Sequence, residues 1–156
     1  MKYVTVKQIR KLIVEKPVIV HENETIKELI LAITGEPRAR VICVVNDDKK
    51  LVGLVTVHDL VKLILPKVPE LLEVDILGPS VWRKLCAEYA HEIMMPPIYV
   101  KDDENIESVL NKLQEAGLDS LPVVDSELHI IGEINLLEIL EVWLEKTVFK
   151  EIRESR

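Results

Sequence analysis

The sequence has little cysteine, glycine or aromatic side chain, and each shortage excludes a class of protein. Its two cysteines, Cys43 and Cys86, stand far apart, which excludes a disulfide framework or a cysteine zinc cluster and fits a reducing cytoplasm. Five glycines and eight prolines among 156 residues exclude a collagen-like or disordered chain. Aromatic residues make up only 4%, so the expected core consists of Val, Ile and Leu.

Long apolar runs and excess positive charge are also missing. No stretch approaches the roughly 20 apolar residues that cross a bilayer, and charges interrupt the apolar N-terminus M-K-Y-V-T-V-K-Q-I-R, which argues against a signal peptide. The net charge of −7 repels a nucleic-acid backbone. We therefore expect a cytoplasmic protein that binds neither membrane nor nucleic acid. The scarcity of glutamine, beside many Ile, Glu and Lys, weakly indicates a thermophilic source.

A repeat fills most of the chain. The segment P-V-I-V-H-E-N-E-T-I-K-E-L-I from Pro17 returns as P-I-Y-V-K-D-D-E-N-I-E-S-V-L from Pro97. Further on, V-I-C-V-V-N-D-D-K-K-L-V-G-L-V-T matches S-L-P-V-V-D-S-E-L-H-I-I-G-E-I-N, which aligns Gly53 with Gly132. The spacing of the copies falls from 80 to 79 positions between these segments, so one residue is lost in the loop that joins them. Such repetition indicates two copies of one structural unit.

Each copy is predicted to have the order β-α-β-β-α, which gives an α/β fold of the α+β type. Thr25-x-x-Glu28 is a capping box, and Asn105 is an N-cap at the matching place. The predicted strands are 18–20, 41–45 and 51–56 in the first copy and 98–100, 121–124 and 130–135 in the second, with closing helices at 57–65 and 136–149. The predicted organisation is a first repeat over 4–65, an apolar, partly helical connector over 66–89, and a second repeat over 90–149.

Three motifs resemble the cystathionine-β-synthase (CBS) domain family: G-L-V-T-V-H-D-L (Gly53–Leu60), P-P-I-Y-V (Pro96–Val100) and S-L-P-V-V-D (Ser120–Asp125). The two copies stand in register over nearly the whole chain. The resemblance implies two repeats packed about a pseudo-two-fold axis, with such modules pairing again into a homodimer. It also implies a regulatory role, in which clefts between the copies bind AMP, ADP, ATP or S-adenosylmethionine.

The residue types from Gly53 to Asp59 indicate, apart from the resemblance, what this segment could bind. Thr56 ends a strand and precedes a helix, whose N-terminal N–H groups suit phosphate. Asp59 lies one turn in, where its carboxylate can accept both hydroxyls of a ribose. The same Thr56-x-x-Asp59 pattern is also an ordinary N-cap, which contributes about 1 kcal/mol to helix stability. The pattern alone leaves both readings open, and the tandem resemblance favours ligand binding.

The resemblance implies a main nucleotide cleft and a second, altered one. In the main cleft, the Thr56/Asp59 motif faces an apolar edge of the other repeat that would hold adenine. In the second cleft, Asn135 and Glu138 replace the Thr and Asp, and Arg40 stands where the family often has a basic residue near phosphates, with Arg38 close by. The predicted main-cleft residues are Leu54, Thr56, His58, Asp59, Met95, Pro97, Ile98 and Leu118, and the second-cleft residues are Pro17, Val18, Ala39, Arg40, Asn135 and Glu138.

No further motif carries chemistry. Glu88 and His91 share one helical face, but a metal site needs more ligands, so a solvated face is preferred and no metal is predicted. No nucleophile motif or P-loop appears, so no catalytic residue is predicted. The predicted function is a non-catalytic sensor of an adenine nucleotide that signals to a separate partner protein. Two alternatives remain, a ligand-free structural or dimerisation module and a nucleotide hydrolase.

Overall fold

The computed structural model describes residues 4–10, 17–64 and 88–154, which belong to two compact units. The first-repeat unit is Pro17–Pro97. The second-repeat unit joins Ile98–Arg156 to the N-terminal Met1–Lys16. Because of this division, the segment that precedes each repeat in the sequence belongs to the unit of the other repeat. The predicted mixed α/β fold is confirmed.

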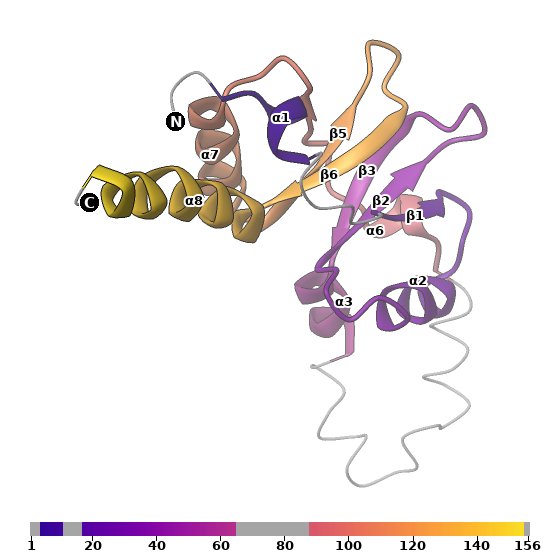
Figure 1. Ribbon diagram of the computed structural model, residues 1–156. Coiled ribbons are helices and arrows are strands. Elements are labelled where there is room, and N and C mark those ends of the chain that lie inside the picture. The colour runs from indigo at the N-terminus through magenta and orange to yellow at the C-terminus, as the bar shows by residue number, and fades with distance from the viewer. Residues whose placement is uncertain (1–3, 11–16, 65–87, 155–156) are drawn as a thin grey trace, which may run out of the picture. The chain divides into compact units, whose positions relative to one another are not determined.

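The first-repeat unit contains a three-stranded sheet with two helices beside it (Figure 1). The strand order is β1-β2-β3, with β1 parallel to β2 and β3 antiparallel to it. The helices α2 and α3 contact each other and the sheet. The elements are β1 (Val18–His21), α2 (Ile26–Thr34), β2 (Val41–Val45), β3 (Leu51–Thr56), α3 (Val57–Ile64) and α6 (Ala90–Ile93).

The second-repeat unit has the same sheet topology. The strand order is β4-β5-β6, with a parallel β4–β5 pair and an antiparallel β5–β6 pair. Its N-terminal helix α1 contacts β6 and the long final helix α8. The elements are α1 (Val6–Arg10), β4 (Val100–Lys101), α7 (Ile106–Ala116), β5 (Ser120–Val124), β6 (Ile130–Asn135) and α8 (Leu136–Glu154).

Side-chain caps fix the start of α2 and α7 at the predicted residues. The Thr25 hydroxyl accepts the N–H of Glu28 at 3.4 Å, and the Glu28 carboxylate accepts the N–H of Thr25 at 3.3 Å, which completes the capping box. The Asn105 side chain accepts the N–H of Ser108 at 2.9 Å. Gly117 ends α7 in the left-handed region at φ 65°, a conformation that glycine adopts without strain.

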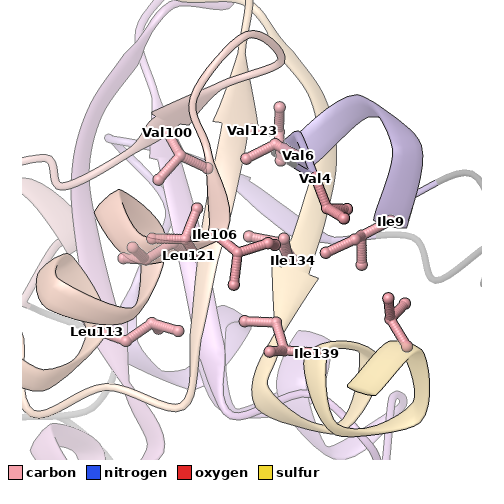
Figure 2. Packing of buried hydrophobic residues seen from close by; sticks show 12 residues of the cluster. Val4, Val6, Ile9, Val100, Ile106, Leu113, Leu121, Val123, Ile134 and Ile139 are labelled. Atoms are coloured by element: carbon pink, nitrogen blue, oxygen red, sulfur yellow. The ribbon is translucent and has the colours of Figure 1, made fainter. Parts of the chain in front are cut away.

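Each unit has its own aliphatic core, and each core includes residues from the segment exchanged with the other repeat. In the second-repeat unit, Val4, Val6 and Ile9 pack among the buried residues of α7, α8 and the sheet, as Figure 2 shows. In the first-repeat unit, Ala90 joins the core, and Ile93 and Met94 pack against it. Neither sequence repeat therefore completes its core alone.

The two exchanged segments attach through matching backbone hydrogen bonds. The N–H of Val6 donates to the carbonyl of Glu104 at 2.9 Å, and the N–H of Ile106 donates to that of Val4 at 3.1 Å. The counterparts in the first-repeat unit are Ala90 to Glu24 at 2.9 Å and Ile26 to Glu88 at 3.0 Å. The internal repeat thus includes the attachment of these segments as well as the sheets and helices.

Several predicted boundaries need correction. The strand predicted over 98–100 is displaced to Val100–Lys101, because Pro96 and Pro97 have no N–H and the carbonyl of Tyr99 accepts a hydrogen bond from Lys112 Nζ at 2.9 Å. The final helix extends beyond the predicted residue 149 to Glu154. Most of the predicted connector 66–89 lies outside the described residues. None of the described helices is long and apolar enough to cross a membrane.

Candidate functional site

The start of α3 carries the Thr56/Asp59 motif in a closed hydrogen-bonded ring. The Thr56 hydroxyl oxygen accepts the N–H of Asp59 at 2.9 Å, and Asp59 Oδ2 accepts the N–H of Thr56 at 3.1 Å. The N–H of Val57 donates to the carbonyl of Arg40 at 3.0 Å, which ties the start of the helix to the segment before β2. The predicted cap is confirmed. It uses one Asp59 oxygen and the acceptor side of the Thr56 hydroxyl, which leaves the hydroxyl proton and Oδ1 without another partner among the described residues.

The segment after α6 lies directly beside this motif. Leu54 and Met95 form an isolated antiparallel bridge, with Leu54 N–H to Met95 O at 3.1 Å and Met95 N–H to Leu54 O at 2.9 Å. A Cβ added to Gly53 would lie 2.4 Å from Met94 Sδ and 2.9 Å from Met94 Cβ. Glycine is required here because the Met94 side chain occupies the space of a side chain at position 53.

Six of the eight predicted main-cleft residues belong to the first-repeat unit. Leu54 is fully buried and His58 is exposed, while Thr56, Asp59, Met95 and Pro97 are half-buried. The other two, Ile98 and Leu118, belong to the second-repeat unit, where both are partly buried against its core. The structure thus brings the polar motif and the Met95–Pro97 part of the apolar edge together within one compact unit.

The predicted second-cleft residues divide between the units in the opposite sense. Pro17, Val18, Ala39 and Arg40 belong to the first-repeat unit, where Val18 is part of the core and Arg40 is exposed. The guanidinium Nη1 of Arg40 donates to the carbonyls of Pro37 at 2.7 Å and Ala39 at 2.9 Å. Hydrogen bonds to its own loop therefore hold this side chain.

Asn135 and Glu138 in the second-repeat unit form a capping pair of different geometry. Asn135 Oδ1 accepts the N–H of Glu138 at 2.9 Å, as predicted for an N-cap. The Asn135 amide Nδ2 donates to Glu138 Oε1 at 3.0 Å, so the two side chains bond each other directly. In the first repeat, by contrast, the carboxylate of Asp59 accepts a backbone N–H.

Arg10 is a residue near this motif that the sequence reasoning missed. Its stem covers Gly132, where an added Cβ would lie 3.1 Å from Arg10 Cδ, in the way that Met94 covers the matching Gly53. Its guanidinium makes two hydrogen bonds to the Asp102 carboxylate at 2.5 and 2.7 Å, and these raise the pKa of Arg10. The only available signal was Gly132 itself, which indicates a close approach without naming the approaching group.

The histidines and remaining acids make local contacts. His21 Nε2 lies 2.7 Å from Asp47 Oδ1, and its Nδ1 accepts the N–H of Asn23 at 3.1 Å, so the ring braces the turn after β1. His91 and Glu92 on α6 are exposed. Within the described ranges, no group of three or more His, Cys, Asp or Glu side chains could hold a metal ion.

The arrangement of the two repeats matches a known family. The sequence profile of the CBS domain matches residues 6–66 and 90–145. The chain belongs to the CBS domain family. A CBS domain-containing protein from Thermotoga maritima is 33% identical to this CBS chain, with a TM-score of 0.71 that covers 91% of this chain and 95% of that one.

Two further solved structures share the fold of this CBS chain. The CBS domain pair of protein MJ0100, in complex with 5′-methylthioadenosine and S-adenosyl-L-methionine, is 23% identical with a TM-score of 0.67 and covers 93% of this chain and 99% of that one. The protein CBSX2 in complex with AMP is also 23% identical, with a TM-score of 0.65 over 90% and 96% of the two chains. At this identity the likeness establishes the fold.

Two curated relatives are much longer than this CBS chain. Homoserine O-acetyltransferase of Methanosarcina acetivorans is 33% identical over 89 residues, which are 57% of this chain and 13% of the enzyme. The uncharacterized protein MJ0188 of Methanocaldococcus jannaschii is 27% identical over 140 residues, which are 88% of this chain and 44% of that protein. The chain therefore spans less than half the length of either relative.

Proposed function

We propose that the chain is a regulatory module that binds an adenosine-containing ligand at the Thr56/Asp59 motif. The Leu54–Met95 bridge carries this proposal, because it holds the apolar edge beside the polar motif in one compact unit. A nucleoside site needs apolar walls for the base and a few fixed polar groups for the sugar. Leu54, Met95 and Pro97 supply the walls, and the Thr56 hydroxyl and Asp59 carboxylate supply the polar groups.

The chemistry of the motif suits a ribose and a phosphate. The free Oδ1 of Asp59 accepts hydroxyl hydrogens from the ribose, and the Thr56 hydroxyl donates to a sugar or phosphate oxygen. The N-terminus of α3 adds a partial positive charge that favours phosphate. His58, exposed on α3, and Ile98 and Leu118 complete the set that the family resemblance implies. The ligands in the MJ0100 and CBSX2 structures support an adenosine compound of the AMP, ADP, ATP or S-adenosylmethionine type.

A second site is proposed around Asn135 and Glu138, with Pro17, Val18, Ala39 and Arg40 as its other residues. The internal repeat supports it, because Asn135 and Glu138 stand where Thr56 and Asp59 stand in the first repeat and cap the equivalent helix. The changed side chains alter what such a site would bind.

The proposed role is regulatory and not catalytic. A ligand with unequal affinity for two arrangements of the module shifts its population toward one of them, and a separate partner protein would read that shift. A cytoplasmic homodimer remains part of the proposal. A structural or dimerisation module that binds no ligand is the alternative, favoured by the departure of the second repeat from the Thr/Asp motif.

Calorimetric titration of the full chain with AMP, ADP, ATP and S-adenosylmethionine tests the proposal. We expect saturable binding of at least one of them, together with a rise in melting temperature, since a ligand at 100 times its Kd adds about 2.7 kcal/mol of stability. Asp59→Ala should abolish binding of AMP, and Thr56→Ala should weaken it. Asp103→Ala, which removes the same charge from an exposed site, is the matched control and should bind like wild type. Absence of binding by every compound at millimolar concentration would favour the ligand-free module.

A further inference from the structure

Two of the three methionines in the chain stand next to each other at the candidate site. Met94 and Met95 directly follow α6, and Met95 forms the bridge to Leu54. Both residues are half-buried, and Met94 packs against the core of the first-repeat unit. A thioether fills apolar space as a leucine does, but a mild oxidant converts it into a polar group. The pair therefore gives this segment a chemistry that an aliphatic side chain lacks.

The sulfur of Met94 lies against the backbone of β3 at Gly53. A Cβ built on Gly53 would overlap Sδ, Cγ and Cβ of Met94, and Sδ is the nearest of these three atoms. The missing side chain of glycine is what lets the sulfur approach the strand so closely. Met94 therefore contacts the sheet through the one atom that oxidation changes.

Few backbone hydrogen bonds hold the Met94–Met95 segment on the sheet. Among the described residues, the segment bonds to β3 only through Met95, by its two hydrogen bonds with Leu54 at 3.1 and 2.9 Å. The next two residues are prolines, which have no N–H to add. The attachment of the apolar edge therefore depends on the packing of Met94 against Gly53.

Oxidation of Met94 would disturb that packing. One oxygen atom of a peroxide bonds to Sδ, which gives up two electrons, and the O–O bond breaks so that hydrogen peroxide leaves as water. The product is a sulfoxide, whose oxygen needs a hydrogen-bond donor. The Gly53 backbone already pairs with Val44 in the sheet. Because an unpaired polar group withdrawn from water is costly, the oxidised side chain should leave the sheet for solvent.

The matching place in the second repeat has no group that responds in this way. Arg10 covers Gly132 there, as Met94 covers Gly53. Its guanidinium is held by two hydrogen bonds to the Asp102 carboxylate, and it contains no sulfur. A peroxide would therefore loosen the covering segment of the first repeat and leave that of the second in place.

We propose that Met94 is a redox-sensitive modification site, whose oxidation to the sulfoxide by a peroxide releases the Met94–Met95 segment from β3 and lowers the affinity for AMP at the Thr56/Asp59 motif. The effect on AMP rests on the proposed nucleotide-binding function, whereas the release of the segment concerns the fold alone. Methionine sulfoxide reductases restore the thioether, so the change is reversible. The module would then respond to an oxidant as well as to a nucleotide.

Treatment of the full chain with hydrogen peroxide tests the inference, and dithiothreitol added afterwards reverses disulfides and sulfenic acids without reducing a sulfoxide. Peptide mass spectrometry measures the sulfoxide at Met94 and Met95, thermal unfolding measures stability, and calorimetry measures AMP binding. For the wild type we expect a sulfoxide at Met94, a fall in melting temperature of roughly 4–8 °C, and a loss of AMP affinity of at least about tenfold. Incubation with the two methionine sulfoxide reductases, one for each epimer, should reverse both effects.

Met94→Leu has a similar volume and cannot be oxidised, so peroxide should change neither its melting temperature nor its AMP affinity. Met95→Leu, whatever its own affinity, should lose as large a fraction of it on treatment as the wild type does. The assignment to Met94 is overturned by an undiminished response in Met94→Leu, by loss of the response in Met95→Leu alone, or by oxidation of Met95 without Met94.

Two further outcomes separate the parts of the inference. An unchanged melting temperature in wild type that carries the sulfoxide at Met94 would overturn the release of the segment. An unchanged AMP affinity in that protein would overturn the link to the site. If untreated wild type binds none of the adenosine compounds, the proposed function fails, and the melting temperature of the oxidised protein still decides whether the segment is released.

Discussion

The substitution Gly53→Ala tests the placement of the Met94–Met95 segment on the first-repeat sheet. The added methyl carbon would lie 2.4 Å from Sδ, 2.7 Å from Cγ and 2.9 Å from Cβ of Met94. All three distances are far inside van der Waals contact. Because the nearest atoms include the Cβ of Met94, a change of rotamer alone cannot relieve the overlap. The Met94 backbone, and with it the Leu54–Met95 bridge, must also shift.

The expected cost follows from this overlap. Extra methyl groups forced into a packed site destabilise by about 1–3 kcal/mol, which corresponds to a fall in melting temperature of roughly 2–4 °C per kcal/mol for a chain of this size. Where there is room, the same Gly→Ala change typically stabilises by about 0.4–1 kcal/mol through the unfolded chain. The overlap with Met94 therefore decides the sign. Displacement of Met95 should also weaken AMP binding.

Gly132→Ala is the matched control, because the repeat places it at the equivalent strand position. There the methyl would lie 3.1 Å from Arg10 Cδ, the only atom closer than 3.5 Å, and a small movement of that side chain accommodates it. We expect a change within about 0.5 kcal/mol. The substitution Met94→Ala removes the Sδ and Cγ atoms that overlap the added methyl. In a double-mutant cycle, Met94→Ala should therefore cost about 1 kcal/mol less stability in the Gly53→Ala background than in wild type.

Urea and thermal unfolding followed by circular dichroism give these differences directly. The reasoning is refuted if Gly53→Ala is as stable as wild type, or if Gly132→Ala loses more stability than Gly53→Ala. Additive effects of Gly53→Ala and Met94→Ala would show that the two residues are not in contact.

Two further predictions concern the second-repeat unit. Gly117→Ala should destabilise the protein by about 1 kcal/mol, because alanine is strained at φ 65° although nothing lies within 4 Å of the added carbon. Gly117→Asn should cost less stability, since asparagine tolerates the left-handed region. Equal melting temperatures for Gly117→Ala and wild type would contradict this reasoning. Burial opposes ionisation of Glu104, but hydrogen bonds from Lys112, the Lys101 N–H and Ser108 hold its pKa below 4.5. Its stabilising effect should therefore be fully present above pH 4.5 and be lost as the pH falls through its lower folded-state pKa. Glu104→Gln should accordingly lose more stability at pH 7 than at acidic pH.

Local signals in the sequence predicted the repeated elements well. Thr25 and Asn105 cap the helices that begin where the caps predict, and the predicted strand pairs 41–45 with 51–56 and 121–124 with 130–135 form. These features depend on neighbours within a few residues, so a short stretch of sequence contains the whole signal. The cap at Thr56 was predictable for the same reason.

The exchanged segments were not predictable from the same signals. The helices α1 and α6 span five and four residues, which is too short for a periodic pattern. Their positions depend on partners far away in the chain, such as Asp102 for Arg10, 92 residues later. The burial of Ser120, Glu133 and Glu138 was missed likewise, because each residue looks ordinary in its own segment.

The exchange of leading segments also determines when each unit can be completed during synthesis. The first-repeat unit has all its residues once the chain has reached Pro97. The earliest residues, with the apolar Val4, Val6 and Ile9, find their partners only after Asp102 and Glu104 have been made. Until then these side chains lack those partners, a stage at which association with the wrong partner competes with folding. A proteolytic cut between the repeats would likewise leave neither fragment with all the residues of its own unit.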